Sequence, residues 1–404
     1  MKPTLLVLEQ YGWQGGAQRV LNCVIEALKS TFEFLVVFPE DGSFAEALRR
    51  RQIETAFLPL GSYRPGQKSW SEMLAFGPRS LYCAGRLAAL IVKRNVELVY
   101  INGPRWLPAG ALAARLTHRP SVFHLHLTLH RRAEAWLVSH AARRTSSIAA
   151  CSATAARSLT RGDPRLITKT RVLYSPLIEE ANGAGVPRPL PPALDEDRRL
   201  TVGFVGRVTE AKGIHVLLKA VTRLPAELRE RLQVLLVGEP APGSAQDRAY
   251  HARLRSCAAA WGLDDKILWA GYQAHLAPYY SAMDVLVAPS LLPEGLHLGI
   301  LEAMHHGVPV IASRSGGILE TVRDGVNGLL VSPGDERALA LALERVLTCS
   351  SLRAQLAQGA LTTVDDRFSV ETFKRGVREV VLKLHSPVAS AGCTVNPEES
   401  TVRP

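Results

Sequence analysis

The chain has 404 residues, of which 48 are Lys or Arg and 37 are Asp or Glu, so its formal net charge is +11. A content of 47% hydrophobic and 21% charged residues is that of a folded protein and excludes wholesale disorder. The six cysteines form no C-x-x-C pair and no short Cys/His spacing, which argues against a disulfide framework or a zinc site. No apolar run approaches the roughly 18 residues of a membrane span. The expectation is a cytoplasmic protein of two or three domains.

The basic excess lies in one half of the chain. Residues 1–180 hold 24 basic and 13 acidic residues, whereas residues 181–404 hold 24 of each. Such an excess is either a solvated surface or a docking face for something anionic. A nucleic-acid binder is the least favoured class, because no known binding module accompanies the charge and aromatic residues make up only 6% of the chain.

Short apolar runs alternate with stretches of helical period, which is the pattern of parallel strands joined by crossover helices. In the first half the apolar runs predict strands at Thr4–Leu8, Phe34–Phe38, Glu97–Ile101, Ser121–Leu127 and Ile148–Ala150. The amphipathic stretches between them predict helices at Ala17–Lys29, Phe44–Arg51, Leu81–Arg94 and Ala109–Leu116. This order is typical of a doubly wound α/β sheet, which binds ligands at the carboxyl ends of its strands.

A second doubly wound domain is predicted after a break in this pattern. Residues 181–199 are rich in Gly and Pro and are interpreted as a linker. Strands are predicted beyond it at Leu200–Val205, Gln233–Val237, Ile267–Ala270, Val285–Ala288 and Pro309–Ala312. The expected organisation is an N-terminal domain over residues 1–180, a C-terminal domain over 200–369, a closing helix over 370–385 and a mobile tail over 386–404. The ligand is expected in a central cleft between the two domains.

The segment from Pro289 to Met304 carries two glutamates, Glu294 and Glu302. A loop rich in Pro and Gly opens a helix there, so backbone N–H groups near Leu298 and Gly299 are expected to point into the cleft, where they favour an anion. The two carboxylates can accept hydrogen bonds from sugar hydroxyls.

Two further segments follow predicted strands. Arg207 and Lys212 lie on a turn bounded by glycines and suit a diphosphate, because Arg can bind it through two hydrogen bonds and Lys acts as a point charge. Near the N-terminus, the pair Gly15-Gly16 leaves no Cβ between the backbone and a ligand. An ordinary surface pair of cations and an ordinary turn are the alternatives.

Together with residues 284–335, these segments resemble the retaining glycosyltransferases of family 4, which have the two-domain GT-B fold. The similarity rests on the strings Glu294-Gly295, Leu301-Glu302-Ala303-Met304, Gly307-Val308-Pro309, Gly316-Gly317, Glu320 and Gly328-Leu329-Leu330-Val331. It is dense in the second half of the chain and thin over residues 40–120, where acceptors bind in this family. Three positions depart from the family pattern: His297 replaces Gly, Gln18 replaces Glu and Ser175 replaces Asn.

The resemblance implies a role for each motif. Glu302 would bind the nucleotide ribose and Glu294 would face the donor sugar, while Arg207 and Lys212 would hold the donor diphosphate and stabilise the departing nucleotide. Gly15 and Gly16 would lie against the donor phosphates. The other donor-binding residues implied are Gly238, Tyr272, His297, Leu298 and Gly299, and His297 is expected to affect donor choice.

Histidines gather in the strand predicted at Ser121–Leu127. Strand alternation places His124 and His126 on one face, a spacing that also occurs in metal sites. No carboxylate or cysteine lies nearby in the sequence, so no metal site is predicted. By the family resemblance, His126 would reach the sugar near the reacting centre, whereas His124 is interpreted as a buried structural residue. His126, Arg207, Lys212 and Glu294 are the predicted catalytic residues.

The activity implied is retaining transfer of a sugar from a UDP- or GDP-linked donor to a hydroxyl of a glycan or lipid-linked acceptor, in surface polysaccharide or lipopolysaccharide assembly. No Asp-x-Asp motif follows a strand, so the expected enzyme uses no metal and no cofactor. A GT-B nucleotide-sugar epimerase and a catalytically impaired scaffold are the alternatives. The basic residues of the N-terminal half are expected to contact an anionic membrane at its inner face. They are Arg49-Arg50-Arg51, Arg79, Arg86, Lys93-Arg94, Arg131-Arg132 and Arg143-Arg144.

Overall fold

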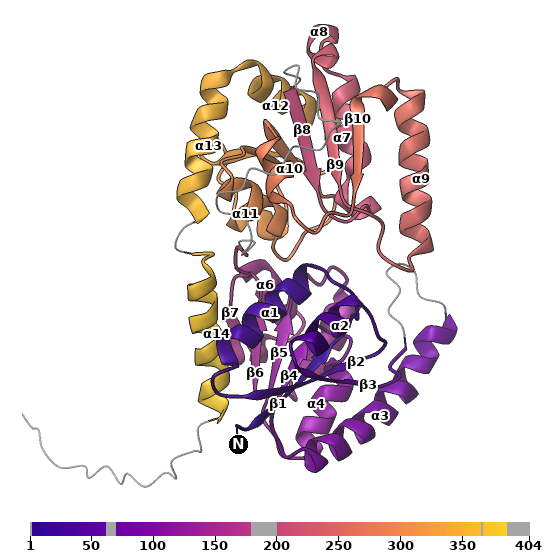
Figure 1. Ribbon diagram of the computed structural model, residues 1–404, viewed down its shortest axis with the longest axis vertical. Helices are drawn as coiled ribbons and strands as arrows, with labels where there is room; N and C mark the ends of the chain where they lie inside the picture. The colour runs from indigo at the N-terminus through magenta and orange to yellow at the C-terminus, as the bar shows by residue number, and fades with distance from the viewer. Residues whose placement is uncertain (1, 62–69, 179–199, 365–366, 386–404) are drawn as a thin grey trace, which may run out of the picture.

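The computed structural model describes residues 2–61, 70–178, 200–364 and 367–385 and contains two parallel α/β domains, one above the other in Figure 1. The predicted linker and the predicted tail lie outside the described residues. The architecture is thus the predicted one, two doubly wound sheets.

The N-terminal sheet has seven strands in the order β3-β2-β1-β4-β5-β6-β7. Their bounds are β1 Thr4–Glu9, β2 Glu33–Phe38, β3 Glu54–Phe57, β4 Val96–Asn102, β5 Ser121–Leu125, β6 Ser147–Ala150 and β7 Thr170–Val172. The helices between them are α1 Gly16–Leu28, α2 Ser43–Arg50, α3 Trp70–Lys93, α4 Leu107–Leu116, α5 Arg132–Ala142, α6 Ala153–Thr160 and the 3₁₀ helix η1 Pro164–Lys169.

The C-terminal sheet has six strands in the order β10-β9-β8-β11-β12-β13. Their bounds are β8 Leu200–Val205, β9 Leu232–Val237, β10 Ile267–Gly271, β11 Val285–Ala288, β12 Val310–Ser313 and β13 Gly328–Val331. The helices are α7 Ile214–Thr222, α8 Ala226–Glu230, α9 Ala245–Ala260, α10 Ala277–Ser281, α11 Leu298–His305, α12 Glu336–Thr348 and α13 Ser350–Val364, with 3₁₀ helices η2 Glu210–Lys212, η3 Asp264–Lys266 and η4 Gly316–Glu320. In each sheet the strand order reverses beside the first strand, which is where such folds bind ligands.

All ten predicted strands are present, with ends shifted by at most two residues. Strand β5 ends at Leu125, so His126 follows the strand instead of lying within it. The predicted start of the third helix was wrong: α3 begins at Trp70 and runs through Pro78. Its early residues give no clear apolar stripe, since Leu74 is 75% exposed.

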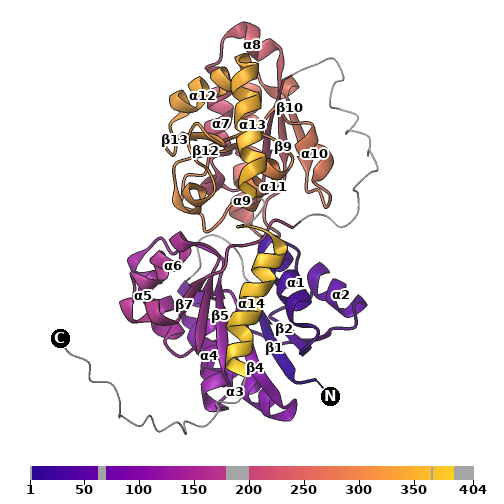
Figure 2. The same cartoon turned by 90° about the vertical axis from the view of Figure 1, so that its left-hand side faces the viewer.

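The last helix, α14 (Val370–His385), packs on the N-terminal domain, where Figure 2 shows it running along that domain's sheet. Phe373, Val377, Val380 and Val381 join the core formed by β1, α1 and β2. The chain therefore crosses between the domains twice. The two crossings are bonded to each other, because the Leu177 N–H donates to the Phe368 carbonyl at 2.8 Å.

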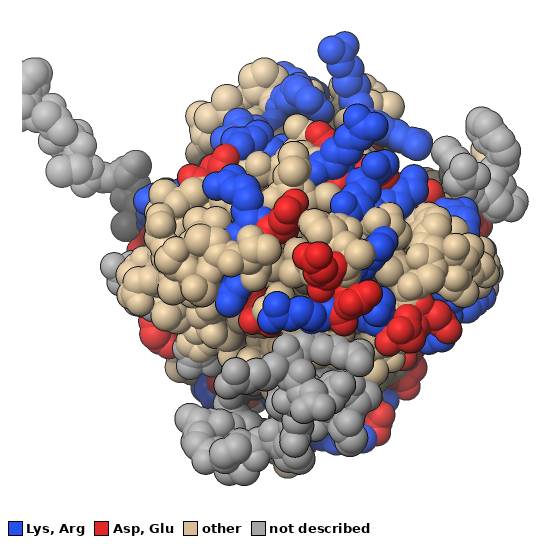
Figure 3. Space-filling view, turned by 90° about the horizontal axis from the view of Figure 1, so that it is seen from above, with Lys and Arg blue, Asp and Glu red and all other residues tan. Residues whose placement is uncertain are grey.

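The outer end of the C-terminal domain carries basic and acidic side chains side by side, as Figure 3 shows from above. This agrees with the balanced charge of residues 181–404. No helix in the described ranges combines the length and the apolarity needed to cross a bilayer.

Candidate active site

An ion pair joins the turn after β8 to the loop after β11. Lys212 Nζ donates to Glu294 Oε2 at 2.6 Å, and the Ser290 hydroxyl donates to Glu294 Oε1. Gly213 allows this approach, because its φ is +68° and a Cβ there would lie 2.1 Å from the Pro289 carbonyl oxygen. Two of the four predicted catalytic residues therefore contact each other.

Glu294 is charged and His297 is neutral at pH 7. Burial alone raises the pKa of Glu294, but attraction from His297 and Lys212 and the hydrogen bonds from Lys212 and Ser290 outweigh it and lower the pKa to about 2. Burial lowers the pKa of His297 to about 4. At neutral pH the positive charge beside Glu294 is therefore that of Lys212.

His297 is a buried polar residue in the middle of this site. It precedes α11 as its N-cap, is 4% exposed, and neither ring nitrogen has a hydrogen-bond partner among the described residues. Its Nε2 lies 3.8 Å from Glu294 Oε1. Its φ of −93° suits any residue, so the histidine that replaces the family's glycine causes no backbone strain. A buried imidazole without partners suggests a group that a ligand satisfies.

Glu302 is bound from both domains. Arg19 of α1 donates to Glu302 Oε1 at 2.6 Å, and the Tyr280 hydroxyl donates to Oε2 at 2.7 Å. Neither partner was predicted from the sequence. A ribose that binds Glu302 must displace Arg19 or share the carboxylate with it.

Other predicted residues also meet at the domain interface. A Cβ on Gly16 would lie 3.3 Å from Leu298, and one on Gly295 would lie 2.9 Å from the His126 carbonyl oxygen. The predicted Gly15-Gly16 turn and His126 thus face the start of α11 and the Glu294 loop. Gly299 lies in the first turn of α11, against the His297 ring.

A second contact between the domains involves Glu320 of η4. Its carboxylate accepts hydrogen bonds from the backbone N–H groups of Ala153 and Thr154 at 2.8 and 2.7 Å, and from the Thr154 hydroxyl at 2.6 Å. These are N–H groups at the start of α6, which the helix itself leaves unpaired. Glu320 therefore binds a helix of the opposite domain through a favourable helix dipole.

Three predicted donor-binding residues follow strands of the C-terminal sheet: Arg207 follows β8, Gly238 follows β9 and Tyr272 follows β10. Gly238 has φ +139°, and a Cβ there would lie 1.8 Å from the Gly206 carbonyl oxygen, so only glycine fits. Arg207 and Tyr272 are exposed. In the described part of the chain, no hydrogen bond or ion pair joins either of them to Lys212, Glu294 or Glu302.

The N-terminal domain contributes a buried polar network that was not predicted from the sequence. Glu9 is fully buried at the end of β1. Its Oε1 accepts from Tyr11 N at 3.0 Å and from Gln18 Nε2 at 2.8 Å, while its Oε2 accepts from Asn102 Nδ2. Asn102 Oδ1 in turn lies 2.7 Å from His126 Nε2. Polar residues that end two buried strands, aligned as Glu9 and Asn102 in the pairing of β1 with β4, were the available signal.

Gln18 fits this network better than the family's usual glutamate would. A glutamate at position 18 would place a second carboxylate against buried Glu9, whereas the amide of Gln18 donates a hydrogen bond to it. Burial raises the pKa of Glu9 to about 7, although its hydrogen bonds from Asn102 and Gln18 oppose the shift. The hydrogen bond to buried Glu9 therefore explains why this chain has Gln18 where the family usually has glutamate.

The rings of the two histidines lie against each other, although His126 follows β5 instead of lying within it. Their ring centroids are 3.9 Å apart. His124 is fully buried and its Nδ1 lies 2.6 Å from the Tyr100 hydroxyl, in agreement with a structural role. Burial lowers the pKa of His126 to about 4, so its ring is neutral at pH 7. Within the described ranges, no three His, Cys, Asp or Glu side chains form a group that could hold a metal ion.

Comparisons with known proteins match both domains. Residues 14–177 match the model of Glycosyltransferase Family 4, and residues 199–349 match that of Glycosyl transferases group 1. A D-inositol 3-phosphate glycosyltransferase of Stackebrandtia nassauensis is 38% identical over 172 residues, which are 41% of this chain and 38% of that protein. The lipopolysaccharide core biosynthesis glycosyltransferase LpsE of Rhizobium meliloti is 36% identical over 167 residues, 41% of this chain and 45% of that protein.

The matched segments thus span less than half the length of these relatives. Among solved structures, Anabaena Alr3699/HepE in complex with UDP and glucose is 24% identical, covers 95% of this chain and 99% of its own, and superposes with a TM-score of 0.76. That similarity extends over both domains and shows the fold. The chain therefore belongs to the family 4 glycosyltransferases and has their GT-B fold.

Proposed function

We propose that the protein transfers a sugar from a UDP- or GDP-linked donor to a hydroxyl of a glycan or lipid-linked acceptor, with retention at the anomeric carbon and without a metal. The observation that carries this proposal is the contact of Lys212 with Glu294 beside the start of α11, opposite His126. The Anabaena structure of the same fold contains UDP and glucose, which supports a nucleotide-sugar donor. LpsE supports a setting in lipopolysaccharide or surface polysaccharide assembly.

In this reaction the leaving diphosphate is stabilised by positive charge. Lys212 supplies an ammonium group, and α11 supplies the unpaired N–H groups of its first turn, which no side chain caps. Arg207 is exposed and free to turn toward the diphosphate. The acceptor oxygen bonds to the anomeric carbon on the face that the diphosphate leaves, and the acceptor proton passes to a diphosphate oxygen. Trapping a covalent glycosyl-enzyme would contradict this front-face displacement.

A panel of nucleotide sugars tests the function. The purified protein is incubated with UDP- and GDP-linked hexoses, and binding is followed by thermal shift while turnover is followed by hydrolysis of the donor. We expect stabilisation by one nucleotide class and slow hydrolysis of one sugar. Epimerised donor would indicate the epimerase, and binding without turnover of any donor or acceptor would indicate the impaired scaffold.

Replacing His297 by glycine is expected to change donor choice without changing affinity for the free nucleotide. A donor sugar that satisfies the buried imidazole loses that hydrogen bond, which weakens its binding by about tenfold. Calorimetric titration with UDP or GDP and with the corresponding nucleotide sugars measures both affinities, and His297→Gln serves as the conservative variant. Equal effects on nucleotide and nucleotide sugar would show that His297 does not contact the sugar.

We also propose that the N-terminal domain contacts an anionic membrane through α5 and η1. Trp136, Leu137 and Ile167 are 53%, 61% and 62% exposed. Arg132 lies one turn before Trp136 on the same side of α5, and Arg131 and Arg144 are exposed at the two ends of the helix. An exposed tryptophan beside arginines suits the interface of an anionic bilayer.

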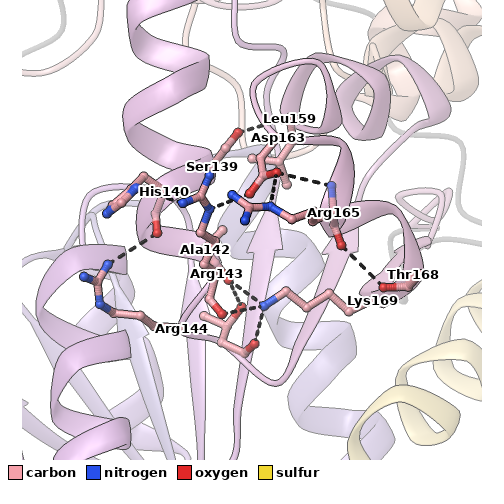
Figure 4. Close-up of polar contacts among 11 residues, drawn as sticks. Ser139, His140, Ala142, Arg143, Arg144, Leu159, Asp163, Arg165, Thr168 and Lys169 are labelled. Atoms are coloured by element: carbon pink, nitrogen blue, oxygen red, sulfur yellow. Dashed lines mark hydrogen bonds and ion pairs between the residues drawn. The ribbon is translucent and has the colours of Figure 1, made fainter.

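Lys169 fixes η1 against this helix. Its Nζ donates to the carbonyl oxygens of Ala142, Arg143 and Thr145 at 2.9, 2.9 and 2.6 Å, as part of the polar contacts shown in Figure 4. Other basic residues of this half already have acidic partners: Arg49 binds Asp41, Arg50 binds Glu46, Arg51 binds Glu26 and Arg94 binds Glu54. The α5 surface is therefore favoured over those clusters.

Co-sedimentation with vesicles containing anionic lipid at low salt tests this contact. The wild type is expected to sediment with anionic vesicles and to remain in solution with neutral ones. The double variant Trp136→Ala/Leu137→Ala is expected to bind at least about fivefold more weakly. Leu341→Ala, which removes a similarly exposed leucine of α12 in the other domain, is the control. If the wild type did not sediment with anionic vesicles, the basic excess would be an ordinary solvated surface and the proposed membrane contact would be wrong.

A further inference from the structure

The buried network around Glu9 determines which way the Asn102 amide faces. Two donors, Tyr11 N–H and Gln18 Nε2–H, converge on Glu9 Oε1, so Oε2 is left to Asn102. At a pH well above its pKa of about 7, Glu9 is ionised, and an ionised carboxylate has no proton to donate. Asn102 must therefore turn its NH₂ group toward Glu9 and its carbonyl oxygen toward His126.

The orientation of Asn102 then determines the protonation of His126. A neutral imidazole carries one ring proton, on either Nδ1 or Nε2. Asn102 Oδ1, 2.7 Å from His126 Nε2, can only accept a hydrogen bond. The ring proton is consequently on Nε2, and Nδ1 is left as the ring nitrogen with a lone pair.

We propose that Glu9 and Asn102 are positioning residues that hold His126 in the Nε2–H tautomer, so that Nδ1 is the ring atom that accepts a hydrogen bond from a hydroxyl of the donor sugar. The contact with the sugar rests on the proposed function; the tautomer does not. His126 lies at the domain interface opposite Gly295, and the residue is partly exposed, whereas His124 is buried. Gln18 belongs to the same network, because its amide helps to keep Oε1 of Glu9 occupied.

The variant Glu9→Gln provides a test, because it keeps the shape of the side chain. It is expected to reverse the orientation of the Asn102 amide and with it the tautomer of His126. Tyr11 and Gln18 would still require an acceptor, so the carbonyl oxygen of the introduced glutamine would take the Oε1 position and its NH₂ group would face Asn102. Asn102 would then present its oxygen to the introduced amide and its NH₂ group to His126 Nε2. Nε2 could only accept, and the ring proton would move to Nδ1.

The tautomer can be measured in the full chain without substrate. Histidine labelled with ¹⁵N in the ring distinguishes protonated from unprotonated nitrogens by their chemical shifts, and His126→Gln identifies the signals of His126 among the 12 histidines. At a pH well above 7, where Glu9 is ionised, we expect Nε2–H in the wild type, Nδ1–H in Glu9→Gln and a mixture in Asn102→Leu. Asn22→Leu is the control. It removes an asparagine of α1 that accepts a hydrogen bond from Arg51, and it should keep the wild-type pattern.

A wild type with Nδ1–H, or an unchanged tautomer in Glu9→Gln, would overturn the proposal. Unlabelled protein adds a second readout: Glu9→Gln should weaken binding of a nucleotide sugar about tenfold and leave that of the free nucleotide unaffected. If the tautomer reverses as expected but no nucleotide sugar binds to the wild type, the positioning stands and the proposed function fails. Thermal unfolding of each variant verifies that it is folded.

Discussion

Replacing Lys212 by alanine is expected to lower kcat for sugar transfer by at least about 1,000-fold, which corresponds to ~4 kcal/mol of transition-state stabilisation. Lys212 is the cation that contacts Glu294, and it is the group that would neutralise the departing diphosphate in the proposed metal-independent reaction. Its loss also leaves the Glu294 carboxylate without its charged partner. Initial rates at saturating donor measure the effect.

Lys219→Ala is the matched control for this prediction. Lys219 lies on the following helix, is half-exposed, and pairs with Glu336 at 3.7 Å, away from the site. Surface pairs of this kind contribute about 0–1 kcal/mol, so the control should keep its activity and its stability. If Lys212→Ala retained activity within about tenfold of the wild type, the assignment of Lys212 to the leaving group would be wrong.

Replacing Glu302 by alanine is expected to weaken binding of the free nucleotide about 100-fold, because the ribose loses a charged hydrogen-bond acceptor. The substitution also removes the acceptor for Arg19 and Tyr280, so the effect on the domain interface must be separated from the effect on the ligand. Calorimetric titration with UDP and GDP measures the affinity.

Arg19→Met separates the two effects. It removes the guanidinium that contacts Glu302 across the interface and keeps the carboxylate available. We expect this variant to bind nucleotide at least as tightly as the wild type, since the ribose no longer competes with Arg19. Wild-type nucleotide affinity in Glu302→Ala would mean that another group binds the ribose.

The local elements of this protein were predictable because their signals are short in range. Buried strands such as Val285–Ala288 are runs of apolar residues, and the motif around Glu294 lies in one loop and the helix that follows it. Strands β3 and β7 were missed because they lie at the two edges of their sheet, where partly exposed residues give no apolar run. The edge strand β13 was not predicted either, although its residues Gly328–Val331 are apolar and mostly buried.

Contacts between the domains were not predictable from the sequence. Arg19 and Glu302 are 283 positions apart, and Glu320 reaches Thr154 across 166 positions. No periodicity or local motif encodes such pairs, since each depends on how the two domains are placed. The Glu9 network was predictable only in part. Polar residues at the ends of adjacent strands indicate a polar site, but they do not show which of them are hydrogen-bonded to each other.

The paired crossings of the chain restrict how the two domains of this protein can move or be exchanged. Since Leu177 and Phe368 are bonded to each other, both covalent connections pass through one pivot, which favours a swivel of the domains over their separation. The N-terminal unit is also discontinuous, because α14 completes its core. A chimaera that takes its C-terminal domain from a relative must therefore be spliced at both crossings and must retain the α14 that completes its N-terminal domain.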